Sequence, residues 1–379
     1  MKFTCDAKEF SKACKIVSKA VAKGTSIPAL EGIKIEAVEN GIVLTGYNLE
    51  TGISTVIRPT SIMKTGIAVI DAKTICKIAK KLPKSCATIS CDNSNIVSIS
   101  SENSNFSIAG LSPDEYPELP KPDEKSNNFE ISQPALKDMI RQTVYAVAQA
   151  DAKPIHTGVQ FTVSEGLLTM AAVDGYRLAI CKEPIEYSGK PSFDFVIPGK
   201  TLTEILDILS DNSDAFASIS VSRRHATISI EDVTVYTRLL EGEFLDWKTV
   251  IPQKCSTAVK VDACAFLSCI ERAAVVGSTT VRSPLRCKFS GEQGGISIAL
   301  STAIGTASDF APADISGDEI EIGFNSKYIS DALSHSYCDE VRLELSTPLS
   351  PMVVKPDSGD SFLFLVLPVR LKSSSEGTE

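Results

Sequence analysis

An internal repeat constrains the fold of this chain more than any other feature of its sequence. Residues 68–73, 195–200 and 322–327 each consist of a short apolar run, a capping or turn residue, and then a lysine. The three lysines, Lys73, Lys200 and Lys327, are evenly spaced along the chain. The interval between them is too long for a solenoid unit and suits a whole domain, so the pattern predicts three copies of one domain.

Each repeat contains two predicted helices in the same order. Asp6, Ser132 and Asp262 follow short predicted strands and are residue types that favour the start of a helix. Apolar residues at helical spacing predict the earlier helices over residues 10–21, 136–147 and 266–276, and the later ones over residues 74–82, 201–209 and 328–333. Short alternating strands fill the remainder, as in residues 33–38 and 42–45 around a turn at 39–41. The prediction is an α+β chain.

The domain boundaries follow from the polar stretches between repeats. A chain of 379 residues exceeds one ordinary core, which agrees with several domains. Residues 113–128 are rich in Pro, Asp, Glu and Asn and are typical of a linker, and a second junction lies near residues 252–256. We therefore predict domains at residues 1–127, 128–253 and 254–379, with a polar tail at 372–379 that we expect to be disordered.

Composition and missing motifs argue against several classes of protein. The sequence has no apolar run long enough to span a bilayer and no apolar signal region at its start, so we expect a cytoplasmic protein without membrane partners. Cysteines are scattered without a Cys-x-x-Cys pair, and Cys14, Cys76, Cys264 and Cys269 fall in apolar helical patterns, where we expect core thiols. No grouping of nucleophile, base and metal ligands is evident, so we expect no catalytic residue, metal or cofactor.

Lysine stripes on two predicted helices are the strongest functional signal from the residues alone. Residues 8–23 hold five lysines and one glutamate, and residues 73–84 hold five lysines and no acid, although the chain carries a net charge of −9. Like charges at this spacing destabilise a helix slightly, so the stripes need a reason. A solvated face is the simpler interpretation of one helix. Two such helices in one domain favour a surface that faces phosphates without reading base sequence.

The predicted DNA-facing set extends weakly beyond the first repeat. In the second and third repeats the basic residues are fewer and stand among acids, so we expect a lopsided basic channel. The candidate DNA-facing residues are Lys8, Lys12, Lys15, Lys19, Lys23, Lys73, Lys77, Lys80, Lys84, Lys137, Arg141 and Lys200.

Several short motifs, in this order and on three repeats, resemble one known family. They are MKF at residues 1–3, EYPELP at 115–120, DGYRLA at 174–179, GEFLDW at 242–247 and LPVRL at 367–371. Over residues 1–371 the chain resembles the bacterial DNA sliding clamps, the beta subunits of DNA polymerase III. The resemblance implies three DNA-clamp domains, each with two helices backed by antiparallel β-sheets, that close as a ring in a head-to-tail dimer.

The resemblance also implies a function and partners. A clamp encircles double-stranded DNA, confers processivity on the replicative polymerase, and is not an enzyme. As a ring-shaped homodimer it would tether the DNA polymerase III alpha subunit, the clamp loader, other polymerases and repair proteins, and it would work at the nucleoid. Two alternatives remain: a peptide-binding scaffold that does not bind DNA, and an enzyme acting on nucleic acid through Asp174, Asp246 or Asp309.

Two sets of site residues follow from the resemblance alone. In the family a groove between the second and third domains captures short peptides containing Gln and Leu or Phe, and an edge of domain one pairs with domain three to close the ring. The matching groove positions are Val173, Gly175, Tyr176, Arg177, Leu178, Leu245, Val250, Leu365 and Leu367 in a first pocket, and His156, Asn325, Tyr328, Leu349, Pro368, Val369 and Arg370 in a neighbouring patch. The matching interface positions are Phe106, Ile108, Val275 and Val276.

Overall fold

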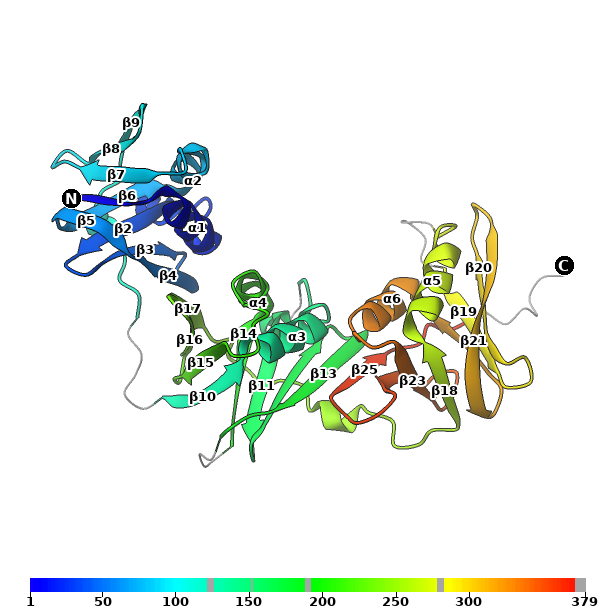
Figure 1. The fold of residues 1–379 in the computed structure, drawn as a ribbon. Coiled ribbons are helices and arrows are strands. Elements are labelled where there is room, and N and C mark those ends of the chain that lie inside the picture. The colour runs from blue at the N-terminus through cyan, green and yellow to red at the C-terminus, as the bar shows by residue number, and fades with distance from the viewer. Residues whose placement is uncertain (121–125, 151–152, 188–191, 278–282, 372–379) are drawn as a thin grey trace. The chain divides into compact units, whose positions relative to one another are not determined.

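The computed structural model describes residues 1–120, 126–150, 153–187, 192–277 and 283–371. The expectation of a disordered tail at residues 372–379 concerns residues outside these ranges. The chain forms two compact units, residues 1–136 with 200–239 and residues 137–199 with 240–379. Residues 128–253, predicted as the second domain, contribute strands to both units (Figure 1).

The first unit holds two antiparallel sheets. In the five-stranded sheet the order is β5 (Pro59–Lys64), β1 (Lys2–Asp6), β7 (Cys86–Cys91), β8 (Ile96–Ser101), β9 (Ser104–Ala109). In the eight-stranded sheet the order is β10 (Asn127–Ser132), β15 (Phe216–Val221), β16 (His225–Ile230), β17 (Val233–Arg238), β4 (Thr51–Ile57), β3 (Gly41–Tyr47), β2 (Gly32–Val38), β6 (Gly66–Asp71). The strand β9 is therefore an edge of its sheet.

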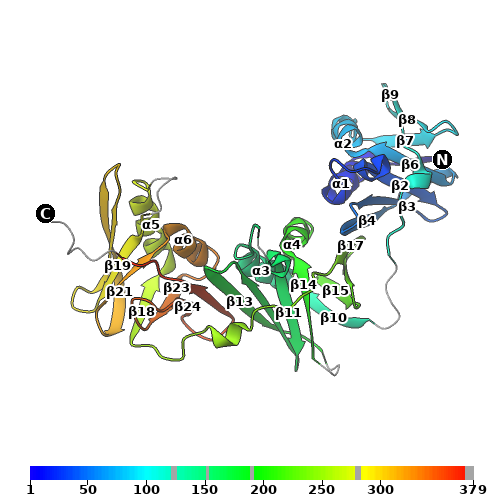
Figure 2. The same cartoon turned by 180° about the vertical axis from the view of Figure 1, so that it is seen from behind.

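Helices α1 (Ala7–Val17) and α2 (Ala72–Lys81) lie side by side in this unit, as both ribbon views show (Figures 1 and 2). The carboxylate of Asp6 accepts hydrogen bonds from the backbone N–H groups of Lys8 and Glu9, which confirms the predicted helix start. Helix α1 contacts β3 and β4 and buries its apolar side, including Phe10 and Val17. A third helix, α4, spans Gly199–Leu206.

The second unit is built on one twelve-stranded sheet. Its order is β14 (Phe193–Pro198), β11 (Gly158–Ser164), β12 (Leu167–Val173), β13 (Arg177–Pro184), β25 (Phe362–Val366), β24 (Met352–Pro356), β23 (Glu340–Leu345), β18 (Thr257–Asp262), β21 (Thr306–Gly317), β20 (Gly295–Ser301), β19 (Leu285–Ser290), β22 (Ile320–Phe324). Its helices are α3 (Gln133–Val144), whose first turn belongs to the first unit, α5 (Ala263–Ala274) and α6 (Ser326–Ser334). Helices α5 and α6 lie against each other (Figure 1).

The last strand makes this sheet continuous between the second and third repeats. Strand β25 pairs on one side with β13, where Leu178 lies opposite Leu365, and on the other with β24. The chain then continues along the same junction: the N–H of Leu367 donates to the carbonyl of Tyr176 at 2.9 Å, and the N–H of Val369 donates to that of Gly323 at 2.7 Å. The segment after β25 is thus attached to both repeats.

The predicted helices occur in the expected places, with corrections in detail. Helix α1 ends at Val17 and a 3-10 turn, Ser18–Ala20, follows it, so the predicted helix to residue 21 was too long. Lys84 lies beyond α2, because Leu82, which precedes Pro83, adopts an extended conformation that ends the helix. Cys264 is exposed on α5, so it is not a core thiol. Among the described residues, no helix is long and apolar enough to cross a membrane.

Candidate functional site

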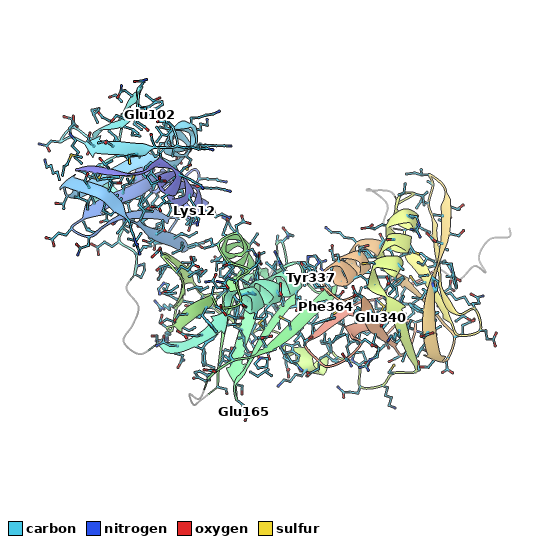
Figure 3. All side chains as sticks on the ribbon, viewed as in Figure 1. Lys12, Glu102, Glu165, Tyr337, Glu340 and Phe364 are labelled. Atoms are coloured by element: carbon cyan, nitrogen blue, oxygen red, sulfur yellow. The ribbon has the colours of Figure 1, made fainter. Side chains whose placement is uncertain are left out.

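The lysine stripes of the first unit face solvent. On α1 and the loop after it, Lys8, Lys12, Lys15 and Lys23 are exposed, and Lys12 is labelled on α1 in Figure 3. On and after α2, the exposed lysines are Lys73, Lys77, Lys80 and Lys84. The opposite side of each helix is apolar and buried, as Phe10 on α1 and Ile75 on α2 illustrate. Two adjacent helices therefore present cationic side chains on the sides that do not pack.

Lys19 departs from this pattern. Its Nζ lies 2.6 Å from Oδ2 of Asp207 and 3.2 Å from Oε2 of Glu204, and its side chain is only 16% exposed. Although partial burial disfavours the charged amine, the hydrogen bonds to Asp207 and Glu204 raise the pKa of Lys19. The charge of Lys19 is thus held by two acids at α4 rather than presented to solvent.

The candidate DNA-facing residues of the second repeat are less accessible as a group. Lys137 is buried at 8% exposure, which does not fit a side chain that reaches a phosphate from the helix surface. Arg141 lies 3.5 Å from Asp138, one turn earlier on α3. Lys200, in the first turn of α4, is exposed. Lys200 is thus the residue of the three that most resembles the exposed lysines of the first repeat.

An apolar floor lies where the second and third repeats join. Buried residues of β12, β13 and β25 form one cluster with partly buried residues of the loop that follows the first unit. We call this cluster the apolar floor; it consists of Ala171, Val173, Leu178, Ile180 and Leu365, with Phe244, Leu245, Trp247, Ile251 and Leu363 packed against it. Val173, Leu178, Leu245 and Leu365 of the predicted first pocket are thereby brought together.

Arg177, the residue before Leu178, lines a cavity. The cavity has a volume of ≈780 Å³, and both repeats line it; we call it the chamber. Its lining residues from the predicted groove are Tyr176, Arg177, Asn325, Tyr328, Leu367, Pro368 and Val369. The remaining wall includes Val147 and Gln149 after α3, Leu300 of β20, and Lys327 of α6. No sequence motif indicated that these four residues would line a cavity.

The turn between β12 and β13 contributes Asp174 and Tyr176 to the wall of the chamber. Oδ1 of Asp174 accepts hydrogen bonds from the N–H groups of Tyr176 at 3.0 Å and Arg177 at 3.1 Å. Gly175 has φ +85°, a conformation that favours glycine, so this turn depends on it. Tyr176, in this turn, is 57% exposed.

Four other predicted groove residues do not line the chamber. His156 lies against Phe244, with ring centroids 5.8 Å apart, and so borders the apolar floor. Val250 and Leu349 are apolar and exposed, at 39% and 63%. Arg370 is exposed beyond the end of the segment that bridges the two repeats. The predicted set therefore comprises a compact central group and a few surface positions around it.

The predicted interface positions carry apolar side chains at the surface of their units. Phe106 and Ile108 are half-buried on β9, an edge strand. Val275 follows α5 and is 81% exposed, while Val276 is half-buried. Apolar side chains on an open sheet edge normally need a cover, because such an edge invites pairing with other chains.

Two of the three acids considered for an enzymatic site are held in ion pairs. Oδ2 of Asp174 lies 2.9 Å from Nε of Arg177, and Oδ2 of Asp309 lies 2.7 Å from Nε of Arg272. The hydrogen bond from Arg272 lowers the pKa of Asp309. Within the ranges that the structure describes, no three His, Cys, Asp or Glu side chains are grouped so that they could hold a metal ion.

Two helices in each of three repeats, on antiparallel sheets, with exposed lysines on the adjacent helices α1 and α2, define a protein of the DNA-clamp class. Three family models match in order: the DNA polymerase III beta subunit N-terminal domain at residues 1–120, the central domain at 130–246 and the C-terminal domain at 248–370. This chain belongs to the family of DNA polymerase III beta subunits, the beta sliding clamps. The three clamp domains expected from the sequence are thereby confirmed.

Individual relatives agree over the full length. The beta sliding clamp of Halalkalibacterium halodurans is 34% identical, covering 98% of this chain and 100% of the relative, and that of Bacillus subtilis is 32% identical with the same coverage. A crystal structure of the Bacillus subtilis DNA polymerase sliding clamp matches with a TM-score of 0.94 at 32% identity, over 98% of this chain and 100% of that one. These relatives are sliding clamps, which is the function that the sequence motifs predicted for this chain.

Proposed function

We propose that two copies of this DNA polymerase clamp close head to tail into a ring around duplex DNA. In this proposal the chain is a non-catalytic, cytoplasmic accessory subunit that works at the nucleoid without a cofactor or metal. The observation that carries the proposal is the pair of exposed lysine stripes on α1 and α2 of an otherwise acidic chain. Such a surface suits the DNA backbone, because contacts with phosphates are electrostatic and independent of base sequence.

Ring closure would use the apolar surface positions of β9 and the end of α5. Phe106 and Ile108 from one copy would lie against Val275 and Val276 of the other, which covers the open edge of the five-stranded sheet. A head-to-tail contact uses two different surfaces of each chain, and it gives a closed ring when the rotation closes after two copies. Retention on DNA is then topological and does not need tight binding.

The apolar floor and the chamber would hold short peptides from partner proteins. We infer that these partners are the DNA polymerase III alpha subunit, the clamp loader, other polymerases and repair proteins. The apolar floor suits a Leu or Phe side chain of such a peptide, and the polar residues in the wall of the chamber suit a Gln side chain. The chamber of ≈780 Å³ has room for several side chains of such a peptide.

Retention on circular DNA tests the ring. The purified chain should have the mass of a dimer by light scattering, should stay on nicked circular DNA after loading, and should be released when the circle is cut. A monomer, or retention that is indifferent to cutting, would contradict the ring. A scaffold that binds peptides but not DNA would bind a Gln- and Leu/Phe-containing peptide yet never be retained on the circle.

A further inference from the structure

The side chain of Arg177 forms ion pairs within the protein, although the family resemblance assigned this residue to the peptide groove. Its Nε lies 2.9 Å from Asp174, and its Nη1 is hydrogen-bonded to the carboxylate of Asp331, a residue 154 positions further along the chain. Partial burial disfavours the charged form, but the hydrogen bond to Asp331 and the charge of Asp174 raise the pKa of Arg177. With its side chain only 10% exposed, Arg177 is held by two carboxylates at the wall of the chamber.

Two aromatic rings contact the same guanidinium group. The ring centroid of Tyr328 is 4.9 Å from Cζ of Arg177, and that of Tyr145 is 5.3 Å away. Both distances suit a favourable cation–π contact. Tyr145 in turn packs edge-on against the buried Phe364, which is labelled in Figure 3, with centroids 5.7 Å apart. Arg177 therefore contacts Tyr145, which follows α3 and packs on β25. It also contacts α6 through Tyr328.

Asp331 and Tyr328 are three positions apart on α6, so they lie on one face of that helix. Arg177 contacts both, through an ion pair with Asp331 and a cation–π contact with Tyr328. The Tyr328 ring also stacks on Tyr176, with centroids 5.7 Å apart and an interplanar angle of 21°. Tyr176 and Tyr328 both line the chamber, whereas Asp331 is not among its lining residues.

These contacts form one connected path from a residue outside the chamber to two rings that line it. We propose that Asp331 and Arg177 are positioning residues: their ion pair sets α6 against the turn at Asp174, and thereby holds the stacked Tyr176 and Tyr328 that a partner peptide packs on. This inference rests on the proposed peptide-binding function. It assigns to Asp331, on the third repeat, control over the affinity of a surface that it does not line.

The affinity of a few variants for a peptide tests this path of contacts. We would titrate the full-length chain into a fluorescent peptide containing Gln, Leu and Phe and follow the anisotropy. Asp331→Asn should weaken binding about tenfold, which corresponds to about 1.4 kcal/mol. Asp331→Glu, which keeps the charge, should recover most of that loss. The matched control is Asp360→Asn. Asp360 is an exposed carboxylate that pairs with Lys182, which lies on β13 as Arg177 does. This variant should bind the peptide like the original chain.

A double-mutant cycle separates positioning from general destabilisation. If Asp331 acts through Tyr328, then Asp331→Asn should cost little further affinity in a Tyr328→Leu background. An undiminished loss in that background would overturn the inference, even if Asp331→Asn also lowers the melting temperature. Equal affinity of Asp331→Asn and the original chain would overturn it as well. Failure of the original chain to bind the peptide would instead remove the proposed groove, and the inference with it.

Discussion

Lys19 and Asp207, 188 positions apart, are joined by an ion pair in which Nζ lies 2.6 Å from Oδ2. Glu204 of α4 is a second partner of the same amine, at 3.2 Å. Lys19 belongs to the same helical stripe as Lys12 and Lys15, which are exposed. One lysine of the predicted DNA-facing set is therefore used to hold the first repeat to the second, and the stripe is shorter than its spacing suggests.

The salt dependence of DNA binding should distinguish Lys19 from its neighbours. Lys12→Gln should reduce the slope of log affinity against log salt by roughly 0.9 for each phosphate that is no longer neutralised, because fewer counterions are released. Lys19→Gln should leave the slope unchanged, since its charge is already paired. The affinity for short linear duplexes would be measured at several low salt concentrations, which together give the slope. A smaller slope for Lys19→Gln than for the original chain would place Lys19 on the DNA after all.

Charge reversal on the two helices should weaken the electrostatic contact with duplex DNA. Lys12→Glu with Lys73→Glu places one reversed charge on each of α1 and α2, and both side chains are exposed, so folding should be unaffected. We expect the affinity for a short linear duplex at low salt to fall by about tenfold or more. The charge-matched control is Lys2→Glu with Lys64→Glu, two exposed lysines on β1 and β5. Equal losses of affinity for both pairs would mean that net charge, not these helices, governs the binding.

An acid on the edge strand β9 should separate the subunits. Phe106→Asp would bury a carboxylate at the proposed contact, and an unpaired buried charge costs several kcal/mol. Light scattering at submicromolar concentration should then report the mass of one chain. Met63→Asp is the control, because Met63 is 54% exposed on β5, the opposite edge of the same sheet. A persistent dimer for Phe106→Asp would show that another surface closes the ring.

Glu183 should make stability depend on pH with a definite sign. Burial, together with the nearby carboxylate of Asp138, raises the pKa of this half-buried residue on β13 above its ordinary value of 4.5. The folded state thus favours the protonated form, so the stability that Glu183 contributes is present below pH 4.5 and is lost as pH rises through the raised pKa.

Glu183→Gln should therefore raise the melting temperature at pH 7 by roughly a degree or two, and should leave it nearly unchanged at a pH well below the ordinary pKa of the carboxyl group. Differential scanning calorimetry of both chains at the two pH values checks this. An equal difference at both pH values would attribute the effect of the substitution to packing rather than to ionisation.

Much of the local structure was predictable from the residues. Asp6 and Asp262 cap helices as expected, because a short acidic side chain reaches the first free N–H groups of its own helix. The hairpin of β2 and β3 follows from alternating apolar residues around the turn at residues 39–41. The exposed lysines follow from helical spacing alone. Each of these properties depends on residues close together in the chain.

The contacts that build the site were not predictable in the same way. Nothing near Arg177 in the sequence indicates Asp331 or Tyr145, and nothing near Lys19 indicates Asp207. The chamber likewise required Gln149 and Leu300, which belong to no recognisable motif. Helical spacing overestimated the lysine stripe for this reason, since it reports which side of a helix faces outward but not which other helix lies there.

The sequence by itself determined the threefold repeat, the helix starts and the two cationic helix faces, because spacing and capping act over a few residues. Only the tertiary structure decided which cations remain exposed to solvent and how Arg177 is held beside the chamber. Ion pairs and ring stacking require atoms within a few ångströms, and the second and third repeats come that close only once strand β25 has completed the sheet between them. The positions of those residues in the sequence do not indicate that they are close in space.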